Sequence, residues 1–155
     1  MRISLHKGFG KTPDTKYNLR KHTPEMQWNA CRLRKGMVIS MTDENCIFCK
    51  IVDGSIPSKK VYEDEKILAF YDLEPQAPVH VLVIPKEHIC CADAVNEENV
   101  GNIAHIFTKI PEITKSLGLT NGYRIVNNCG EDGCQSVKHM HFHILGGKKL
   151  NGTMA

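Results

Sequence analysis

The sequence HMHFHIL at residues 139–145 is the strongest indication of the fold, because histidine alternates with apolar residues in it. Such alternation is typical of a β-strand with one buried face. Successive side chains of a strand point to opposite faces, so the three imidazoles would share one face while Met140, Phe142 and Ile144 enter the core. At a rise of about 3.3 Å per residue, neighbouring imidazoles would lie about 7 Å apart. Each histidine could then have a different task.

The three histidines favour chemistry on phosphorus, because imidazole is largely neutral at pH 7 and attacks without a separate base. One ring could attack, the next could donate a hydrogen bond, and the third could serve elsewhere. Two alternatives stay open. A His-x-His pair on a strand can ligate zinc, and a single buried histidine can be a hydrogen-bonded core residue. Strict alternation of three histidines favours catalysis over a purely structural role.

The loop before this stretch, CGEDGCQS at residues 129–136, supports the same interpretation. Its glycines and small polar side chains can aim backbone N–H groups and a hydroxyl at a phosphate, whose oxyanions need several donors. The Gly-Glu-Asp-Gly sequence is also a good turn, so the loop alone indicates little. Its position directly before three histidines favours anion binding.

The remaining segments predict one α+β domain. Strand-like runs occupy residues 60–63, 67–72, 79–85, 123–128 and 137–145. The run at 79–85, VHVLVIP, is nearly continuous and β-branched, which is typical of a strand buried on both faces. After it, apolar residues at helical spacing predict one main helix that Asn96 caps, Pro111 kinks or restarts, and Gly118 ends. Strands, one helix and strands again favour a largely antiparallel sheet.

Charge divides the 155 residues into two parts. Residues 1–41 carry nine basic residues against two acidic ones, a net charge of +7, and lack periodicity, so we expect a disordered basic extension. Residues 42–155 carry eleven basic and fifteen acidic residues, a net charge of −4, and are long enough for one domain. The domain is therefore not expected to bind nucleic acid. No apolar run approaches the roughly 20 residues of a membrane span, so no membrane partner is expected.

Seven cysteines and the lack of an apolar signal region favour a reducing compartment, which is the cytoplasm, with the nucleus included. The basic extension also allows a mitochondrial presequence, although Pro13 and Pro24 would break an amphipathic helix. A third interpretation is that the extension reflects the choice of start codon, since Met37 and Met41 directly precede the patterned region.

Two of the cysteines, in CIFC at residues 46–49, have the spacing that lets two thiolates reach one tetrahedral zinc. Redox motifs share this spacing, and two buried thiols without a metal are a further alternative.

Together with its flanks, QSVKHMHFHILGG at 135–147 resembles the signature of the histidine-triad (HIT) superfamily. The branch it resembles most is that of the histidine-triad nucleotide-binding proteins, which are purine nucleoside phosphoramidases. Further matches lie in order between Asn45 and about Lys149: IFCKI at 47–51, FYD at 70–72, PQAPVH at 75–80, IPKEH at 84–88 and GYR at 122–124. The resemblance implies a HIT-like fold over residues 42–155, with a five-stranded antiparallel sheet, one main helix and a short helix. It also implies a homodimer across which the sheet continues.

The resemblance assigns roles within a purine nucleotide site. His141 would attack the α-phosphorus to give a nucleotidyl-imidazole that water hydrolyses, and His143 would donate to a phosphoryl oxygen. His80 and Ser136 would complete the catalytic set, and Asp72 would accept hydrogen bonds from the ribose hydroxyls. The implied nucleotide-binding residues are Ile47, Phe48, Phe70, Tyr71, Asp72, Leu73, Asn128, Gln135, Ser136, Val137, His141 and His143.

Metal-containing members of the superfamily suggest a second site by the same resemblance. It consists of Cys46, Cys49, His88 and His139. Two sulfurs and two nitrogens make a closed structural zinc site, which would anchor the first histidine and leave the second to attack.

Two departures from the pattern bear on the leaving group. Cys134 stands where the nucleotide branch commonly has glycine, and residues 148–155 replace a C-terminal extension that carries an aromatic residue. A dinucleoside polyphosphate hydrolase that uses the same His141 is therefore an alternative, and a non-catalytic nucleotide-binding module is another.

Overall fold

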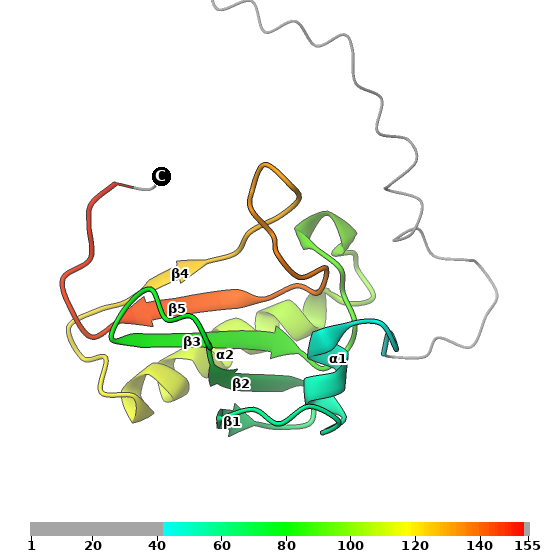
Figure 1. Cartoon of the computed structure of the whole chain (residues 1–155), viewed down its shortest axis with the longest axis horizontal. Coiled ribbons are helices and arrows are strands. Elements are labelled where there is room, and N and C mark those ends of the chain that lie inside the picture. Colours follow the sequence, from blue (N-terminus) through cyan, green and yellow to red (C-terminus); the bar gives the residue numbers. More distant parts are fainter. Residues whose placement is uncertain (1–41, 154–155) are drawn as a thin grey trace, which may run out of the picture. The chain divides into compact units, whose positions relative to one another are not determined.

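A computed structural model describes residues 42–153 and shows a five-stranded antiparallel sheet in the order β1-β2-β3-β5-β4 (Figure 1). The expected extension at 1–41 lies outside the described residues. The elements are α1 (Ile47–Val52), β1 (Lys60–Glu63), β2 (Ile67–Tyr71), β3 (Val79–Pro85), a 3₁₀ turn (Ala92–Ala94), α2 (Val100–Ser116), β4 (Arg124–Val126) and β5 (Phe142–Gly146). The expected α+β class, with five antiparallel strands, one main helix and a short helix, is confirmed.

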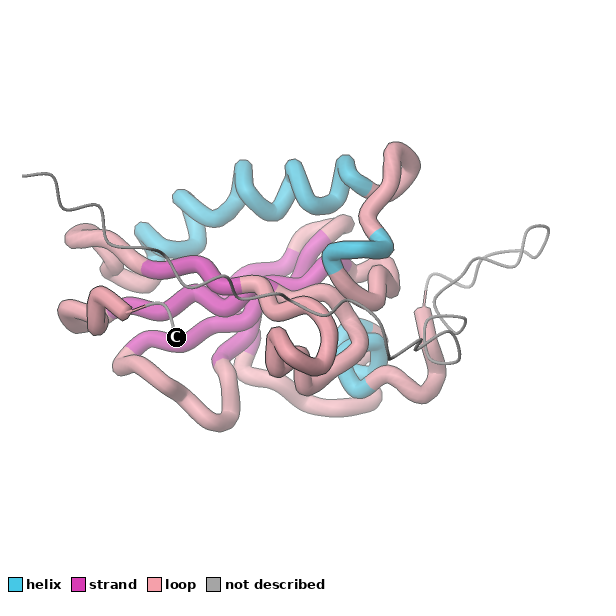
Figure 2. Tube along the Cα trace, turned by 90° about the horizontal axis from the view of Figure 1, so that it is seen from above, coloured by secondary structure: helices cyan, strands magenta, loops and turns pink. Residues whose placement is uncertain are grey.

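The sheet is covered on both faces, and its central strand explains why. Figure 2 shows α2 along one side of the sheet and α1 on the other. Alternate residues of β3 pack toward the two sides: Val81 and Val83 belong to the cluster under α2, whereas Leu82 belongs to the cluster with α1. The continuous apolar run of β3 is therefore buried on both faces, as its composition predicts.

Helix α2 differs from the sequence expectation at two points. Pro111 neither kinks nor restarts it, since the helix is continuous from Val100 to Ser116. This residue lies on the exposed side of the helix, where the carbonyl that loses its N–H partner can bind water. Asn96 caps the turn that leads into the helix rather than the first assigned helical residue: its side chain accepts from the N–H groups of Glu98 and Asn99, and its carbonyl accepts from the N–H of Val100, where the helix begins. Within residues 42–153 no helix has the length and apolar character of a membrane span.

The strand that carries the histidines is shorter than its alternation predicts. β5 begins at Phe142 rather than at residue 137, so only His143 of the three histidines lies inside it. The main chain before it pairs outside the sheet; for example, the Met140 N–H donates to the Ile89 carbonyl at 2.5 Å. The predicted faces are nevertheless correct, because Met140, Phe142 and Ile144 are buried in the cluster under α2. The expected strand at 123–128 also shortens, to β4.

Candidate catalytic and metal-binding sites

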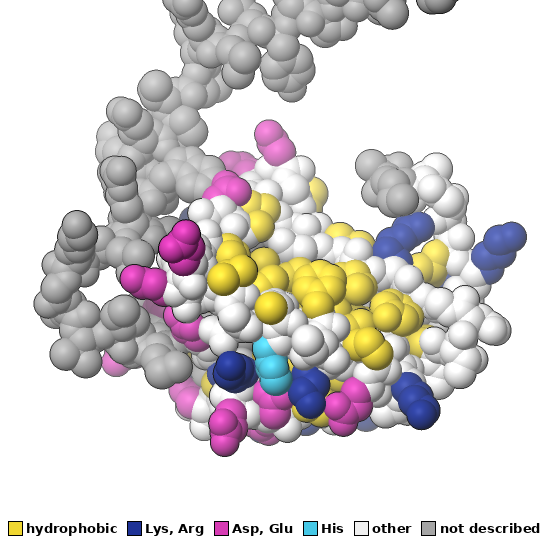
Figure 3. Space-filling model, turned by 180° about the vertical axis from the view of Figure 1, so that it is seen from behind, with side chains coloured by type: hydrophobic (Ala, Val, Ile, Leu, Met, Phe, Trp, Pro, Cys, Tyr) yellow, Lys and Arg dark blue, Asp and Glu magenta, His cyan; other side chains and the backbone are white. Residues whose placement is uncertain are grey.

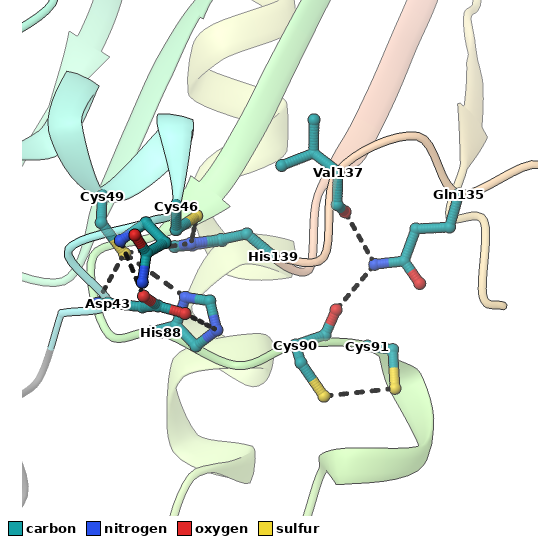
Figure 4. Close-up of polar contacts among 10 residues, drawn as sticks. Asp43, Cys46, Cys49, His88, Cys90, Cys91, Gln135, Val137 and His139 are labelled. Atoms are coloured by element: carbon teal, nitrogen blue, oxygen red, sulfur yellow. Dashed lines mark hydrogen bonds and ion pairs between the residues drawn. The ribbon is translucent and has the colours of Figure 1, made fainter. Parts of the chain in front are cut away.

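Four candidate metal ligands from three segments converge beside the end of β3 (Figure 4). Cys46 and Cys49 belong to the start of α1, His88 follows β3, and His139 precedes β5. One atom of each lies within 4.8 Å of the others. The Sγ–Nδ1 distances are 3.5 Å for Cys46–His139 and 3.4 Å for Cys49–His88. Zn–S bonds of about 2.3 Å and Zn–N bonds of about 2.0 Å at a tetrahedral angle require about 3.5 Å between sulfur and nitrogen. The four residues therefore fit zinc.

The orientation of His139 also suits a ligand. Its Nε2–H donates to the Pro85 carbonyl at 2.9 Å, so the Nδ1 lone pair faces the two sulfurs. The side chain is fully buried, and burial lowers the pKa of His139 to about 4, which keeps the ring neutral at pH 7. Burial also lowers the pKa of His88 and raises the pKa of the Cys49 thiol to about 11. A cation at the centre would favour the thiolate instead.

Asp43 supports this cluster from outside the ligand set. Its backbone N–H donates to Cys49 Sγ at 3.3 Å, and its Oδ2 lies 4.0 Å from His88 Nε2. A carboxylate on this side of the His88 ring favours a proton on Nε2 and a lone pair on Nδ1.

His141 lies beside the cluster and carries the opposite tautomer. Its Nδ1–H donates to the main-chain carbonyl of His139 at 2.7 Å, because a carbonyl can only accept. The lone pair is then on Nε2, the other ring nitrogen. The side chain is buried, and its ring meets the edge of Phe48 at a centroid distance of 5.3 Å. His141 is therefore a fixed imidazole with one unprotonated nitrogen.

A chain of hydrogen bonds fixes the proton of His143. The Gln76 backbone N–H donates to His80 Nδ1 at 3.2 Å, so the proton of neutral His80 lies on Nε2. The His80 Nε2–H therefore donates a hydrogen bond to His143 Nδ1, at 2.8 Å. The proton of His143 is then on Nε2, a buried atom with no hydrogen-bond partner among residues 42–153. Burial, with the neighbouring His141 and His80, lowers the pKa of His143 to about 4.

A buried N–H without an acceptor is costly unless a ligand supplies one. The centroids of the His141 and His143 rings are 5.0 Å apart. The site therefore offers a lone pair and a hydrogen-bond donor on two neighbouring rings, which suits attack on a phosphorus atom whose oxygen accepts a hydrogen bond from the donor.

Asp72 lies against the rings of His80 and His143. Its Oδ2 is 3.4 Å from His80 Nε2 and 4.0 Å from His143 Nδ1, and its Oδ1 accepts from the Glu74 N–H. Burial lowers the pKa of His80, and the Asp72 charge opposes that shift. These three side chains could also be considered metal ligands. However, two nitrogen ligands of one tetrahedral zinc lie about 3.3 Å apart, so the 2.8 Å contact between His80 and His143 indicates a hydrogen bond.

Gln135 occupies its side chain with loop contacts (Figure 4). The Nε2 atom donates to the carbonyls of Cys90 at 2.6 Å and Val137 at 2.9 Å, and the Oε1 atom accepts from the Gly130 N–H. The amide thus fastens the 129–136 loop to the segment after β3. A nucleotide contact through this side chain stays a prediction.

The predicted nucleotide-binding residues fall into distinct environments. Ile47, Ser136 and Val137 share an open pocket of about 270 Å³ with Asp43, Asn45, Cys46 and Lys138. Phe48 and Phe70 are buried and pack edge to face at a centroid distance of 5.7 Å. Phe48 in turn packs against the ring of His141. Leu73 is 97% exposed, and Tyr71 and Asn128 are partly exposed.

Sequence reasoning missed three groups that orient the histidines. Asn127 Nδ2–H donates to the His141 carbonyl at 2.8 Å. The Gln76 N–H and the Pro85 carbonyl bind His80 and His139 through main-chain atoms. Main-chain contacts leave no trace in residue identity. Only Asn127, next to the predicted Asn128, offered a polar side chain as a signal.

The comparisons with known proteins agree with this geometry. Residues 53–150 match the HIT domain family, and the chain belongs to this family. A maize protein named 14 kDa zinc-binding protein is 43% identical over 113 residues, covering 72% of this chain and 88% of the maize protein. The structure of a histidine triad protein from Clostridium difficile has a TM-score of 0.71 and 49% identity, covering 73% of this chain and 99% of that one. A HIT family hydrolase from Legionella pneumophila has a TM-score of 0.69 and 43% identity, covering 72% of this chain and 100% of its own.

Proposed function

We propose that this protein hydrolyses purine nucleoside 5′-phosphoramidates through a covalent nucleotidyl-His141 intermediate. The observation that carries the proposal is the pair of tautomers set by hydrogen bonds: the neutral His141 ring has its lone pair on Nε2, and the neighbouring His143 ring has an Nε2–H with no partner among residues 42–153. A pure binding site needs no nucleophilic lone pair. The name of the Legionella relative, a HIT family hydrolase, supports hydrolysis.

In the proposed reaction the His141 Nε2 lone pair attacks the α-phosphorus and forms a P–N bond. The phosphoramidate P–N bond breaks, and the leaving amine keeps the electron pair of that bond and takes a proton from a solvent water. His143 Nε2–H donates to a phosphoryl oxygen and stabilises the added negative charge. Water then attacks phosphorus and releases a proton to the solvent, which replaces the proton taken by the amine; the bond to His141 breaks, and its electron pair returns to Nε2. Ser136, at the end of the 129–136 loop, lines the pocket and would bind the leaving amine.

We propose that the nucleoside lies along the pocket at the start of α1. Ile47 is half exposed and lines the pocket, so it can contact a purine face. Asp72 reaches the histidines through Oδ2 while Oδ1 binds the Glu74 N–H, so ribose hydroxyls would share its remaining lone pairs.

We propose zinc as a structural ion held by Cys46, Cys49, His88 and His139. The donor distances support the assignment, and so does the name of the maize relative. Zinc would supply no chemistry to the reaction, since its four ligands leave no open position. These thiols must stay reduced to bind it, which favours a cytoplasmic location.

A homodimer is proposed from two exposed features. β4 pairs only with β5 among the described strands, which leaves its outer edge open to a second copy. On the α2 side, apolar side chains gather in a broad patch (Figure 3). Two apolar side chains of α2, Phe107 and Val100, are about half exposed, at 50% and 47%. A second copy that covered α2 and paired with β4 would bury both features.

The function is tested with adenosine 5′-phosphoramidate and diadenosine tetraphosphate on the same protein preparation. Faster turnover of the phosphoramidate, with AMP as product, is the expected result. Faster turnover of the tetraphosphate would replace this proposal with the polyphosphate hydrolase. Binding of AMP without turnover of either compound would leave a nucleotide-binding module.

A further inference from the structure

We propose that Asn127 is a positioning residue that holds the nucleophile through its main chain; this rests on the proposed function. The β3–β5 ladder ends at the pair Val83↔Phe142, and the β4–β5 ladder ends at Val126↔His143. The main chain of His141 therefore lies just beyond both ladders, where no strand supplies a partner. The Asn127 side chain replaces the missing strand, since Nδ2–H donates to the His141 carbonyl at 2.8 Å.

His141 is consequently held at two points. Its ring donates through Nδ1–H to the His139 carbonyl, and its own carbonyl accepts from Asn127. The first contact fixes the tautomer and the second fixes the peptide that carries the ring. Without the second contact, the peptide could rotate and displace Nε2 from the line of attack, to which phosphoryl transfer is sensitive.

The register separates Asn127 from the substrate. If the register of Arg124↔Leu145 and Val126↔His143 is extended by two residues beyond the end of the ladder, residue 128 would lie opposite His141 and residue 127 opposite Phe142. Opposite residues of antiparallel strands share a face. On this extended register Asn128 would share the face of the nucleophile, whereas Asn127 would share the face of Phe142, which is buried under α2. Asn127 therefore acts through His141, and Asn128 provides a matched comparison on the substrate side.

The chemistry of the contact defines the variants. Only the amide nitrogen of asparagine can donate to a carbonyl. Asn127→Asp keeps the shape and replaces the donor by a charged carboxylate, and Asn127→Ala removes shape and donor without adding a charge, so a loss shared by both variants is due to the missing donor. If shape alone mattered, Asn127→Asp would behave as wild type.

The kinetic test measures the first step, formation of the nucleotidyl-enzyme, by rapid mixing with adenosine 5′-phosphoramidate. Both Asn127 variants should lower this rate and kcat by roughly ten- to a hundredfold, as misplacement of a reacting group does. KM and the Kd for AMP should stay within about twofold. Asn128→Ala should instead act mainly on KM. Unchanged kcat in Asn127→Asp, or a loss confined to KM, overturns the proposal.

A second readout does not need turnover. Long-range ¹H–¹⁵N spectra of the imidazoles should show one sharp His141 signal set with the proton on Nδ1 in the wild type. In Asn127→Asp this set should broaden or split, while the thermal unfolding curve stays cooperative. An unchanged His141 signal in that variant contradicts the role of Asn127. If the wild type hydrolyses no nucleotide, the proposed function fails, and the spectra still decide whether Asn127 holds His141.

Discussion

Two histidine clusters lie next to each other in this protein and use the same side chain for opposite purposes. In the cluster of Cys46, Cys49, His88 and His139, the Nε2–H of His139 donates a hydrogen bond to the main-chain carbonyl of Pro85. The lone pair on His139 Nδ1 therefore faces the centre of the cluster. In the cluster of His80, His141 and His143, the His139 carbonyl leaves the lone pair of His141 on Nε2. The Gln76 N–H acts through His80 and leaves His143 with an Nε2–H that has no partner among residues 42–153. The partner of the distal nitrogen decides whether a histidine is suited to ligate, attack or donate.

His139 connects the two clusters. Its ring faces the cysteines, and its main-chain carbonyl accepts a hydrogen bond from His141 Nδ1–H. An ion that fixed His139 would therefore also fix the acceptor that sets the tautomer of the nucleophile. The two clusters are separate in chemistry and connected in structure.

The largest expected effect comes from removing the nucleophile. His141→Ala should lower kcat by at least about 10⁴-fold, because covalent catalysis is lost at one atom. AMP should still bind, since most of the predicted nucleotide contacts belong to other residues. Turnover assays and calorimetric titration with AMP measure the two quantities. Retention of more than about a tenth of the activity would exclude His141 as nucleophile.

Breaking the metal cluster should have a smaller effect on turnover and a larger one on stability. Cys49→Ser should lose the roughly one zinc per chain and on the order of a few kcal/mol of unfolding free energy. Turnover should fall by about tenfold as the His139 carbonyl shifts. Elemental analysis and thermal unfolding provide the readouts, with the exposed Cys134→Ser as the zinc-retaining control. Freshly purified wild type without metal would remove the zinc site from the account.

A pH series sharpens the comparison within the catalytic cluster. Burial and its neighbours lower the pKa of His143 to about 4, from 6.5 when unfolded. Between these values the unfolded chain binds a proton that the folded chain does not, so unfolding free energy decreases as the pH falls from 6.5 toward 4. The contribution of His143 is on the order of 1–3 kcal/mol. Urea unfolding of wild type and His143→Gln across this range should show a shallower decline in the variant, and parallel declines would contradict the buried neutral ring.

The smallest expected effect concerns the 129–136 loop. Cys134 has a φ of +57°, a left-handed conformation that favours glycine. Cys134→Gly should raise the unfolding free energy by about 0.5–1 kcal/mol, because relief of strain exceeds the added entropy of the unfolded chain. Cys134→Ala keeps the Cβ and should not stabilise the protein. Equal stability of the two variants in thermal unfolding would show that strain is absent.

The sequence predicted the sheet and the sidedness of its last strand better than it predicted strand ends. Alternation in 139–145 correctly identified which residues enter the core, because burial follows the period of the side chains. It placed the strand start too early, since the main chain before Phe142 binds Ile89 and Asn127 instead of a neighbouring strand. Strand length depends on where partners end, which a single segment does not encode.

The candidate site was predictable where side chains carry the chemistry. The cysteine spacing and the three histidines are visible in the sequence, and the resemblance added His80 and His88. The tautomers were not predictable, because they depend on the Pro85 and His139 carbonyls and on the Gln76 N–H. Any residue presents these groups, so only the fold brings them to the histidines.

The central claim is tested most directly by trapping the intermediate. The protein is mixed with adenosine 5′-phosphoramidate, quenched during the first turnover, digested and sequenced by tandem mass spectrometry. We expect one adenylyl group on His141, absent from His141→Ala and still formed in Cys134→Ala. An adenylyl group on His139 or His143, or turnover at the full rate with no adduct at any time point, would contradict the account.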